Sequence, residues 1–145
     1  MSTRLKEKLE RISELLERLA LQSAKGIPII VEGQNDEKTL RTLALSGEII
    51  AAKTRKSFLA VATEIERLNV EEVILLLDFD RRGKEWTKRL TQYLEHTRTK
   101  PNTFFWTELH SLVGREVKDI EGILPFIFTL KKKSGNSQTI IERIL

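Results

Sequence analysis

The fold prediction depends most on one stretch of the sequence, Val73-Ile74-Leu75-Leu76-Leu77-Asp78-Phe79-Asp80. Its unbroken apolar part predicts a strand that is covered on both faces, which is typical of a parallel sheet. A similar run at residues 27–31 comes earlier in the chain and is followed directly by Glu32. The carboxyl ends of parallel strands open onto the crevice where α/β sheets bind ligands. We therefore expect Glu32, Asp78 and Asp80 to lie together in that crevice.

Strands and helices alternate on both sides of these two runs. Residues 49–51 and Thr103–Trp106 predict two further strands, with a turn at Pro101-Asn102. Apolar side chains at helical spacing predict helices through residues 40–44, 58–68 and 86–94, and a short one at Leu109–Val113. This alternation predicts an α/β fold with a parallel sheet of about four strands, flanked by helices and joined by right-handed crossovers.

Helical segments are predicted at both ends of the chain. Leucines and an isoleucine recur at three- and four-residue steps from Leu5 to Leu19, and Gly26 suits the end of this amphipathic helix. The helix either covers one face of the sheet or forms a coiled-coil seam, and its shortness favours the first. Beyond residue 122 we expect an apolar stretch 123–130, a solvated turn 131–137 and a closing helix. The predicted parts are an N-terminal helix (1–25), an α/β domain (26–122) and a helical C-terminal extension (123–145).

Composition narrows the class of protein. The 145 residues contain no cysteine, which excludes disulfides, thiolate catalysis and cysteine-ligated zinc, and only two histidines, too few for a histidine-based metal site. No stretch is long and apolar enough to span a membrane, so we expect a soluble, cytoplasmic protein without a membrane partner. The net charge of +4 fits a polyanionic partner such as nucleic acid.

The three acids at the strand ends point to metal chemistry. Carboxylates that converge repel one another unless a cation joins them, and Mg²⁺ takes carboxylate, water and phosphate oxygens. Arg81, Arg82 and Lys84 follow Asp80 closely and suit phosphate contacts. Each feature alone also has a plainer interpretation: Glu32 as a helix cap, the two aspartates as turn residues, and the basic residues as a solvated face. The combination favours phosphoryl-transfer chemistry.

Two motifs resemble those of the Toprim domain: Val31-Glu32-Gly33-Gln34-Asn35-Asp36 and Leu77-Asp78-Phe79-Asp80-Arg81-Arg82-Gly83. Toprim domains occur in topoisomerases, bacterial primases, nucleases and recombination-repair proteins. The resemblance is nearest to the small primase-like Toprim proteins and to the ribosomal-RNA-maturation ribonucleases. It covers residues 26–122 and implies a compact Rossmann-like fold. It further implies a general acid or base at Glu32, which also serves as an occasional metal ligand, Mg²⁺ or Mn²⁺ ligands at Asp78 and Asp80, and turns at Gly33 and Gly83.

Two further groups of residues are candidates for the same site. Asp36, Asp119 and Glu121 either add carboxylates to it or cap helices. Lys53, Arg55 and Lys56 follow the strand at 49–51, so they are expected on the same rim, where they contact the nucleic-acid backbone or form a solvated loop.

The resemblance implies Mg²⁺-dependent phosphodiester chemistry on nucleic acid, as a small endonuclease for RNA or DNA. One alternative is a non-catalytic binding module in an RNA-processing or DNA-repair assembly, with protein partners recruited by the basic rim or the N-terminal helix. Primase-like nucleotidyl transfer is a weaker alternative. The chain has no room for the separate domain that carries a topoisomerase tyrosine, and it lacks the zinc-binding part of a replicative primase.

Overall fold

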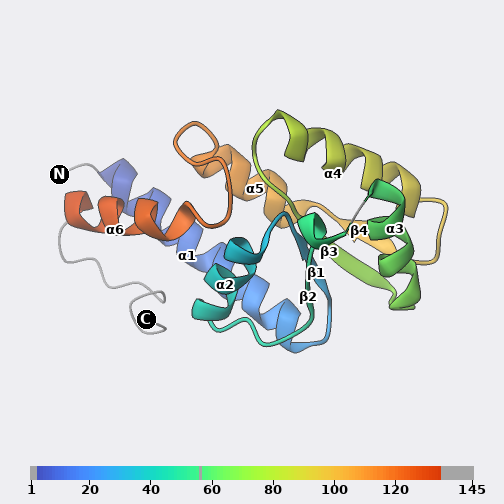
Figure 1. Ribbon diagram of the computed structural model, residues 1–145. Coiled ribbons are helices and arrows are strands. Elements are labelled where there is room, and N and C mark those ends of the chain that lie inside the picture. The colour runs from blue at the N-terminus through green and yellow to red at the C-terminus, as the bar shows by residue number, and fades with distance from the viewer. Residues whose placement is uncertain (1–2, 56, 135–145) are drawn as a thin grey trace.

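The computed structural model describes residues 3–55 and 57–134, and a parallel sheet with the strand order β2-β1-β3-β4 lies at its centre (Figure 1). The central strand pair β1–β3 is in register with Ile30 opposite Leu75, and β2 pairs with the other side of β1. The predicted α/β fold with a parallel four-stranded sheet is confirmed. The strands are β1 (Ile29–Val31), β2 (Ile49–Ala51), β3 (Glu72–Leu76) and β4 (Lys100–Asn102).

Helices cover both faces of the sheet (Figure 1). They are α1 (Thr3–Ala24), α2 (Gln34–Thr42), α3 (Phe58–Arg67), α4 (Arg81–Leu94), α5 (Phe104–Val113) and α6 (Ile123–Ser134), with a short 3₁₀ turn η1 (Ala52–Thr54). None of the described helices is long and apolar enough to cross a membrane.

The alternation of side chains along the strands divides the buried residues into two clusters. Val31 and Ile74 face one cluster, to which α1, α2, α5 and α6 also contribute. Ile30 and Leu75 face the other, which α3 and α4 complete. The segments at both ends of the described chain are therefore built into the same core as the sheet.

Helix α1 buries its apolar stripe within the molecule. Leu9, Ile12 and Leu19 are fully buried in the larger cluster, and the helix packs against α5 and α6. The Arg11 guanidinium also forms an ion pair of 2.7 Å with Glu108 of α5. This arrangement agrees with the first alternative, a helix that covers the sheet. Little of the apolar stripe is left exposed to form a coiled-coil seam with another chain.

The predicted fourth strand at Thr103–Trp106 is wrong, because these residues lead into and begin helix α5. The strand lies instead at Lys100–Asn102, where a turn was predicted. The Asn102 side-chain oxygen accepts the Phe104 N–H at 2.9 Å, an Asx turn that ends the strand and redirects the chain into the helix.

Pro101 is accommodated because β4 is an edge strand. The Lys100 N–H donates to the Glu71 carbonyl of the neighbouring segment at 2.8 Å. Since successive residues of a strand direct their backbone groups to opposite sides, the ring nitrogen of Pro101 faces the open edge, where no ladder hydrogen bond is lost.

The C-terminal segment is helical for longer than predicted. Helix α6 includes Lys131, Lys132 and Lys133, which were predicted to form a solvated turn. Basic residues in the last turn of a helix are stabilised by its dipole, so their charge is compatible with helical structure. The predicted closing helix near residues 140–145 and the basic residue Lys56 lie outside the described residues.

A stability prediction arises at Ala44, which has a φ of 68° just after α2. The left-handed conformation costs a residue with a Cβ roughly 1–2 kcal/mol, whereas glycine adopts it freely. We expect Ala44→Gly to raise the free energy of unfolding by about 0.5–1 kcal/mol, measured by urea denaturation. Ala20→Gly, inside α1, is the control and should lower it by about 1 kcal/mol. A loss of stability in both variants would contradict the prediction.

Candidate functional site

The acids at the ends of β1 and β3 are brought together because these two strands are neighbours in the sheet. Glu32 directly follows β1, and its side chain is buried with only 3% exposure. Asp78 follows two residues after the end of β3 and is partly buried. The Asp78 backbone N–H donates to Glu32 Oε1 at 3.4 Å. Glu32 and Asp78 are therefore in contact, but the carboxylate oxygens of Glu32, Asp78 and Asp80 do not form a three-residue group within 4.8 Å of one another in the described part of the chain.

Asp78 has the most perturbed carboxyl group at this edge of the sheet. Burial is the main cause that raises its pKa to about 7, and the negative charges of Glu32, Asp36, Asp80 and Asp119 raise it further. Its Oδ1 atom is buried and has no hydrogen-bond partner among the described residues. A buried carboxylate oxygen without a donor, surrounded by other acids, suits a bound cation.

Asp80 lies beyond the end of the strand and caps the helix that follows. Strand β3 ends at Leu76, and Asp80 is the N-cap of α4, where its Oδ1 accepts the Gly83 N–H at 2.8 Å. Its side chain is exposed, while Phe79 beside it is buried in the core. The charge of Asp80 contributes to the raised pKa of Asp78, but Asp80 lines neither of the two hollows at this edge of the sheet.

A second group of acids lies beside the first. One carboxylate oxygen from each of Asp36, Asp119 and Glu121 lies within 4.8 Å of the others, and no other such group of three is found among the described residues. Asp36 is buried, and burial is the main cause that raises its pKa. These three residues were predicted as either additional site acids or caps, and the structure brings them together.

Backbone hydrogen bonds explain how this second group is assembled. Asp36 Oδ1 accepts the Glu121 N–H at 2.9 Å and its Oδ2 accepts the Gly33 N–H at 3.1 Å. Asp119 Oδ1 accepts the Gly122 N–H at 2.7 Å, just before α6, in a capping arrangement. The segment before α6 is thereby attached to the turn after β1.

A polar hollow of about 410 Å³ opens between these acids, and Lys53 lies in its wall together with Asp36, Asp78 and Asp119. A smaller hollow of about 110 Å³ lies next to it and is lined by Glu32, Lys53, Arg55, Arg82 and Trp86, among others. Negative and positive side chains therefore meet along one rim, which is the arrangement expected where a metal and a phosphate are held together.

The predicted basic residues do not all reach these two hollows. Lys53, Arg55 and Arg82 line them, whereas Arg81 and Lys84 line neither. Lys84 is instead near His110, whose pKa is lowered mainly by burial and also by the Lys84 charge.

The two glycines of the motifs have different roles. Gly33 has a φ of −136°, an extended conformation that any residue adopts. Gly83 lies inside α4 rather than in a turn before it, and a Cβ at this position would lie 1.9 Å from the Asp78 carbonyl oxygen. Glycine at position 83 thus permits close approach of α4 to the backbone of Asp78.

Two tryptophans contribute to the site in ways that the sequence did not reveal. The Trp106 indole N–H donates to the carbonyls of Leu77 and Asp78 at 3.0 and 3.3 Å, so it supports the turn that carries Asp78. Trp86, in the helix predicted over residues 86–94, is only partly buried and lines the small hollow beside Glu32. The spacing of Phe105, Leu109 and Val113, four residues apart, was the available signal for the helix that positions Trp106.

Known proteins are similar to this chain in sequence and in fold. The family model of the Toprim domain matches residues 27–112. A UPF0292 protein of Methanosarcina acetivorans is 36% identical over 91% of this chain and 90% of its own length. One of Methanocaldococcus jannaschii is 37% identical over 83% and 93%, respectively. A solved structure of a protein from Aquifex aeolicus superposes with a TM-score of 0.61 at 25% identity and covers 76% of this chain and 95% of that one. With the fold and the acidic site in place, these matches show that the chain belongs to the Toprim-domain family and is a relative of the archaeal UPF0292 proteins.

Proposed function

We propose that this protein is a Mg²⁺-dependent enzyme that cleaves phosphodiester bonds in nucleic acid, as a small endonuclease for RNA or DNA. The observation that supports it most is the buried, unpartnered Oδ1 of Asp78 beside the buried carboxylate of Glu32. Membership of the Toprim family supports a metal-dependent role on nucleic acid.

The chemistry of the donor set fits a hard divalent cation. Every candidate ligand is a carboxylate, and carboxylate oxygens are the protein ligands that Mg²⁺ and Mn²⁺ prefer. On this proposal Asp78 and Asp80 hold the ion, with Glu32 as an occasional further ligand. When bound, such an ion neutralises charge on the reacting phosphate and lowers the pKa of an attacking water.

The residues of the chain supply binding and proton transfer. Glu32 is held in place by the Asp78 N–H, and it would accept a proton from the attacking water at its carboxylate. Lys53, Arg55 and Arg82 line the adjacent hollow and would orient the phosphate through charge-assisted hydrogen bonds. The burial of Glu32 keeps bulk water away from the proton-transfer step.

Asp36 and Asp119 take a positioning role in this proposal. Both oxygens of Asp36 and one oxygen of Asp119 already accept backbone N–H groups. Their charges add to the field at Asp78, while their hydrogen bonds hold the segment before α6 against the site.

The test is cleavage of end-labelled structured RNA and DNA in the presence of Mg²⁺, with Glu32→Gln as the first variant. General acid–base catalysis contributes roughly 100- to 10,000-fold, so we expect cleavage to fall by about 100-fold or more. Glu37→Gln is the matched control, because Glu37 lies on α2 in an i,i+4 pair with Arg41 and lines neither acidic hollow. Equal cleavage by wild type and Glu32→Gln would refute the proposed role of Glu32.

A non-catalytic nucleic-acid-binding module is the second candidate function. It is favoured by the helix-capping hydrogen bond of Asp80, whose Oδ1 already accepts the Gly83 N–H and therefore has fewer free lone pairs for a metal. Nucleic-acid binding without turnover under all metal conditions would support this second candidate and remove the first.

A further inference from the structure

Three hollows follow one another around the connection between η1 and α3. The polar hollow of about 410 Å³ shares Lys53 with the small one and Thr54 with a third hollow of about 510 Å³. The small and the third hollow share Arg55 and Ser57 in their walls. Since neighbouring hollows have wall residues in common, the three lie side by side on the surface, and we call this row of hollows, which leads away from the carboxylates, the path.

The small hollow combines an aromatic ring with cations. Trp86 is partly exposed there, and the Arg82 guanidinium carbon lies 5.6 Å from the centre of its ring. The edge-to-face contact of Trp86 with Phe58, with centroids 5.6 Å apart, fixes the indole against α3. A fixed indole next to guanidinium groups is the combination that binds an unpaired base and its phosphate.

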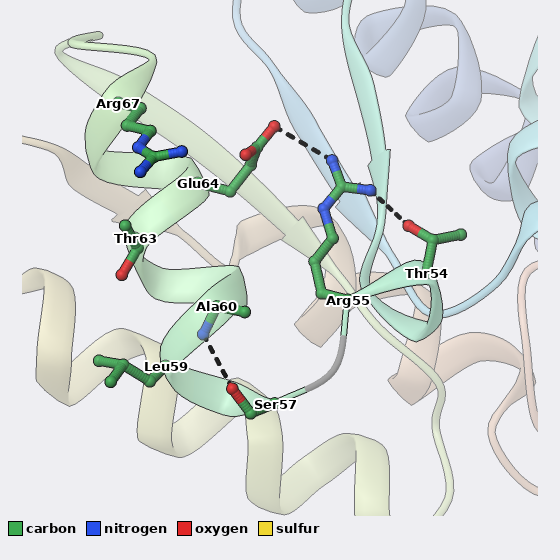
Figure 2. A pocket seen from close by; sticks show the side chains of 8 residues that line it. All are labelled: Thr54, Arg55, Ser57, Leu59, Ala60, Thr63, Glu64 and Arg67. Atoms are coloured by element: carbon green, nitrogen blue, oxygen red, sulfur yellow. Dashed lines mark hydrogen bonds and ion pairs between the residues drawn. The ribbon is translucent and has the colours of Figure 1, made fainter.

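The third hollow lies against the exposed side of α3 (Figure 2). The Arg55 guanidinium reaches toward α3, where it pairs with Glu64 at 3.1 Å and also bonds the Thr54 hydroxyl (Figure 2). Arg67 lies further along the same helix, and Leu59 on it is 64% exposed. The hollow is therefore lined by the ion-paired guanidinium of Arg55, by a second guanidinium from Arg67 and by the exposed apolar side chain of Leu59.

We propose that this path binds an unpaired strand of nucleic acid that flanks the reacting phosphate. One base stacks on Trp86, and backbone phosphates contact Arg82 and Arg55. This inference rests on the proposed function in one respect, because the strand is placed with its reacting phosphate at Asp78. An unpaired strand is favoured over a duplex because a base stacks on a side chain only when its face is free of its own neighbours.

Binding can be measured without turnover by fluorescence anisotropy of the full chain in EDTA, with a labelled single-stranded oligonucleotide and a blunt duplex as probes. Trp86→Leu keeps an apolar contact for Phe58 but removes the stacking face. Because stacking on an aromatic side chain contributes strongly per base, we expect single-strand affinity to fall about tenfold and duplex affinity by less than about twofold. Tyr93→Leu is the matched control, because Tyr93 also contacts Phe58 edge-to-face from α4 but lines none of the three hollows.

A direct signal comes from the Trp106→Phe background, in which Trp86 is the remaining tryptophan. We expect the single strand to quench its fluorescence, and thermal unfolding of each variant verifies that it is folded. Unchanged single-strand affinity in folded Trp86→Leu, or an equal loss for both probes, would overturn the path. Trp86-dependent binding without cleavage would refute the proposed function alone, whereas cleavage with Trp86-independent binding would refute the path alone.

Discussion

The Asp78→Asn variant is expected to lose cleavage by on the order of 1000-fold and yet to be more stable than the wild type in metal-free buffer at pH 8. Removing a metal ligand removes several kcal/mol of stabilisation from the transition state, and each 1.36 kcal/mol corresponds to a tenfold change in rate. The gain in stability has a separate cause, which is the cost of a buried negative charge among other acids.

The sign of the pH dependence follows from the pKa of Asp78. Burial, and then Glu32 and the neighbouring aspartates, raise this pKa from 3.8 to about 7 in the folded protein. Between these two values the folded state binds more protons than the unfolded state, so the free energy of unfolding decreases as the pH rises. The penalty is complete above pH 7. The raised pKa of Asp36 acts in the same direction, so part of the pH dependence will remain in the variant.

Thermal unfolding of wild type and Asp78→Asn from pH 4 to pH 9 in EDTA measures this effect. The two curves should diverge progressively from about pH 4 and reach their full separation above pH 7, with the variant above the wild type. Added Mg²⁺ should raise the unfolding temperature of the wild type at pH 8 and should have much less effect on the variant. Parallel pH curves would show that Asp78 is not the source of the repulsion. Equal stabilisation of both proteins by Mg²⁺ would show that Asp78 does not bind the metal.

The Gly83→Ala variant is expected to lose about 3 kcal/mol or more of its free energy of unfolding, a large effect for one methyl group. The new Cβ would lie 1.9 Å from the Asp78 carbonyl oxygen and 2.5 Å from its carbonyl carbon. Both are backbone atoms, which cannot rotate away as a flexible side chain does. Either α4 or the turn that carries Asp78 must therefore move, so metal affinity should fall together with stability.

Gly33→Ala is the matched control for this prediction. A Cβ there would lie 3.7 Å from Lys53 Cδ and 3.9 Å from Asp36 Oδ2, which are ordinary contacts. Urea denaturation should therefore show a loss for Gly33→Ala that is within about 1 kcal/mol. Similar losses of unfolding free energy for the two variants would mean that the backbone near Gly83 can shift to accept a methyl group without loss of stability.

The central sheet was predictable because its strands have strong local signals. The apolar runs before Glu32 and Asp78 have the pattern of doubly covered strands, and their carboxyl ends had to meet once the strands were parallel. The fourth strand was not predictable from the same signal. It is three residues long and contains Pro101, whereas the aromatic residues that follow favour strands by propensity and form a helix only through tertiary packing.

The arrangement of the acids was predictable only in part. Strand ends brought Glu32 and Asp78 together, but the contact between Asp36 and Glu121 joins residues 85 positions apart. It depends on the Phe79 N–H, which donates to the Lys118 carbonyl at 2.7 Å and fixes the segment before α6. Local spacing contains no information on such a contact. The start of α4 directly after Asp80 was not predicted either, because it depends on the close packing of Gly83 against the Asp78 backbone.

Pro101 has a consequence for how copies of this protein meet. An exposed edge strand normally presents a row of unpaired backbone groups to which a strand of another chain can hydrogen-bond. Long edge strands of this kind promote aggregation. At the centre of β4 the outward-facing position carries a ring in place of a donor, and the strand spans only three residues. An incoming segment would gain too few hydrogen bonds there to stay in register, so we expect this edge of the sheet to disfavour strand addition by another copy.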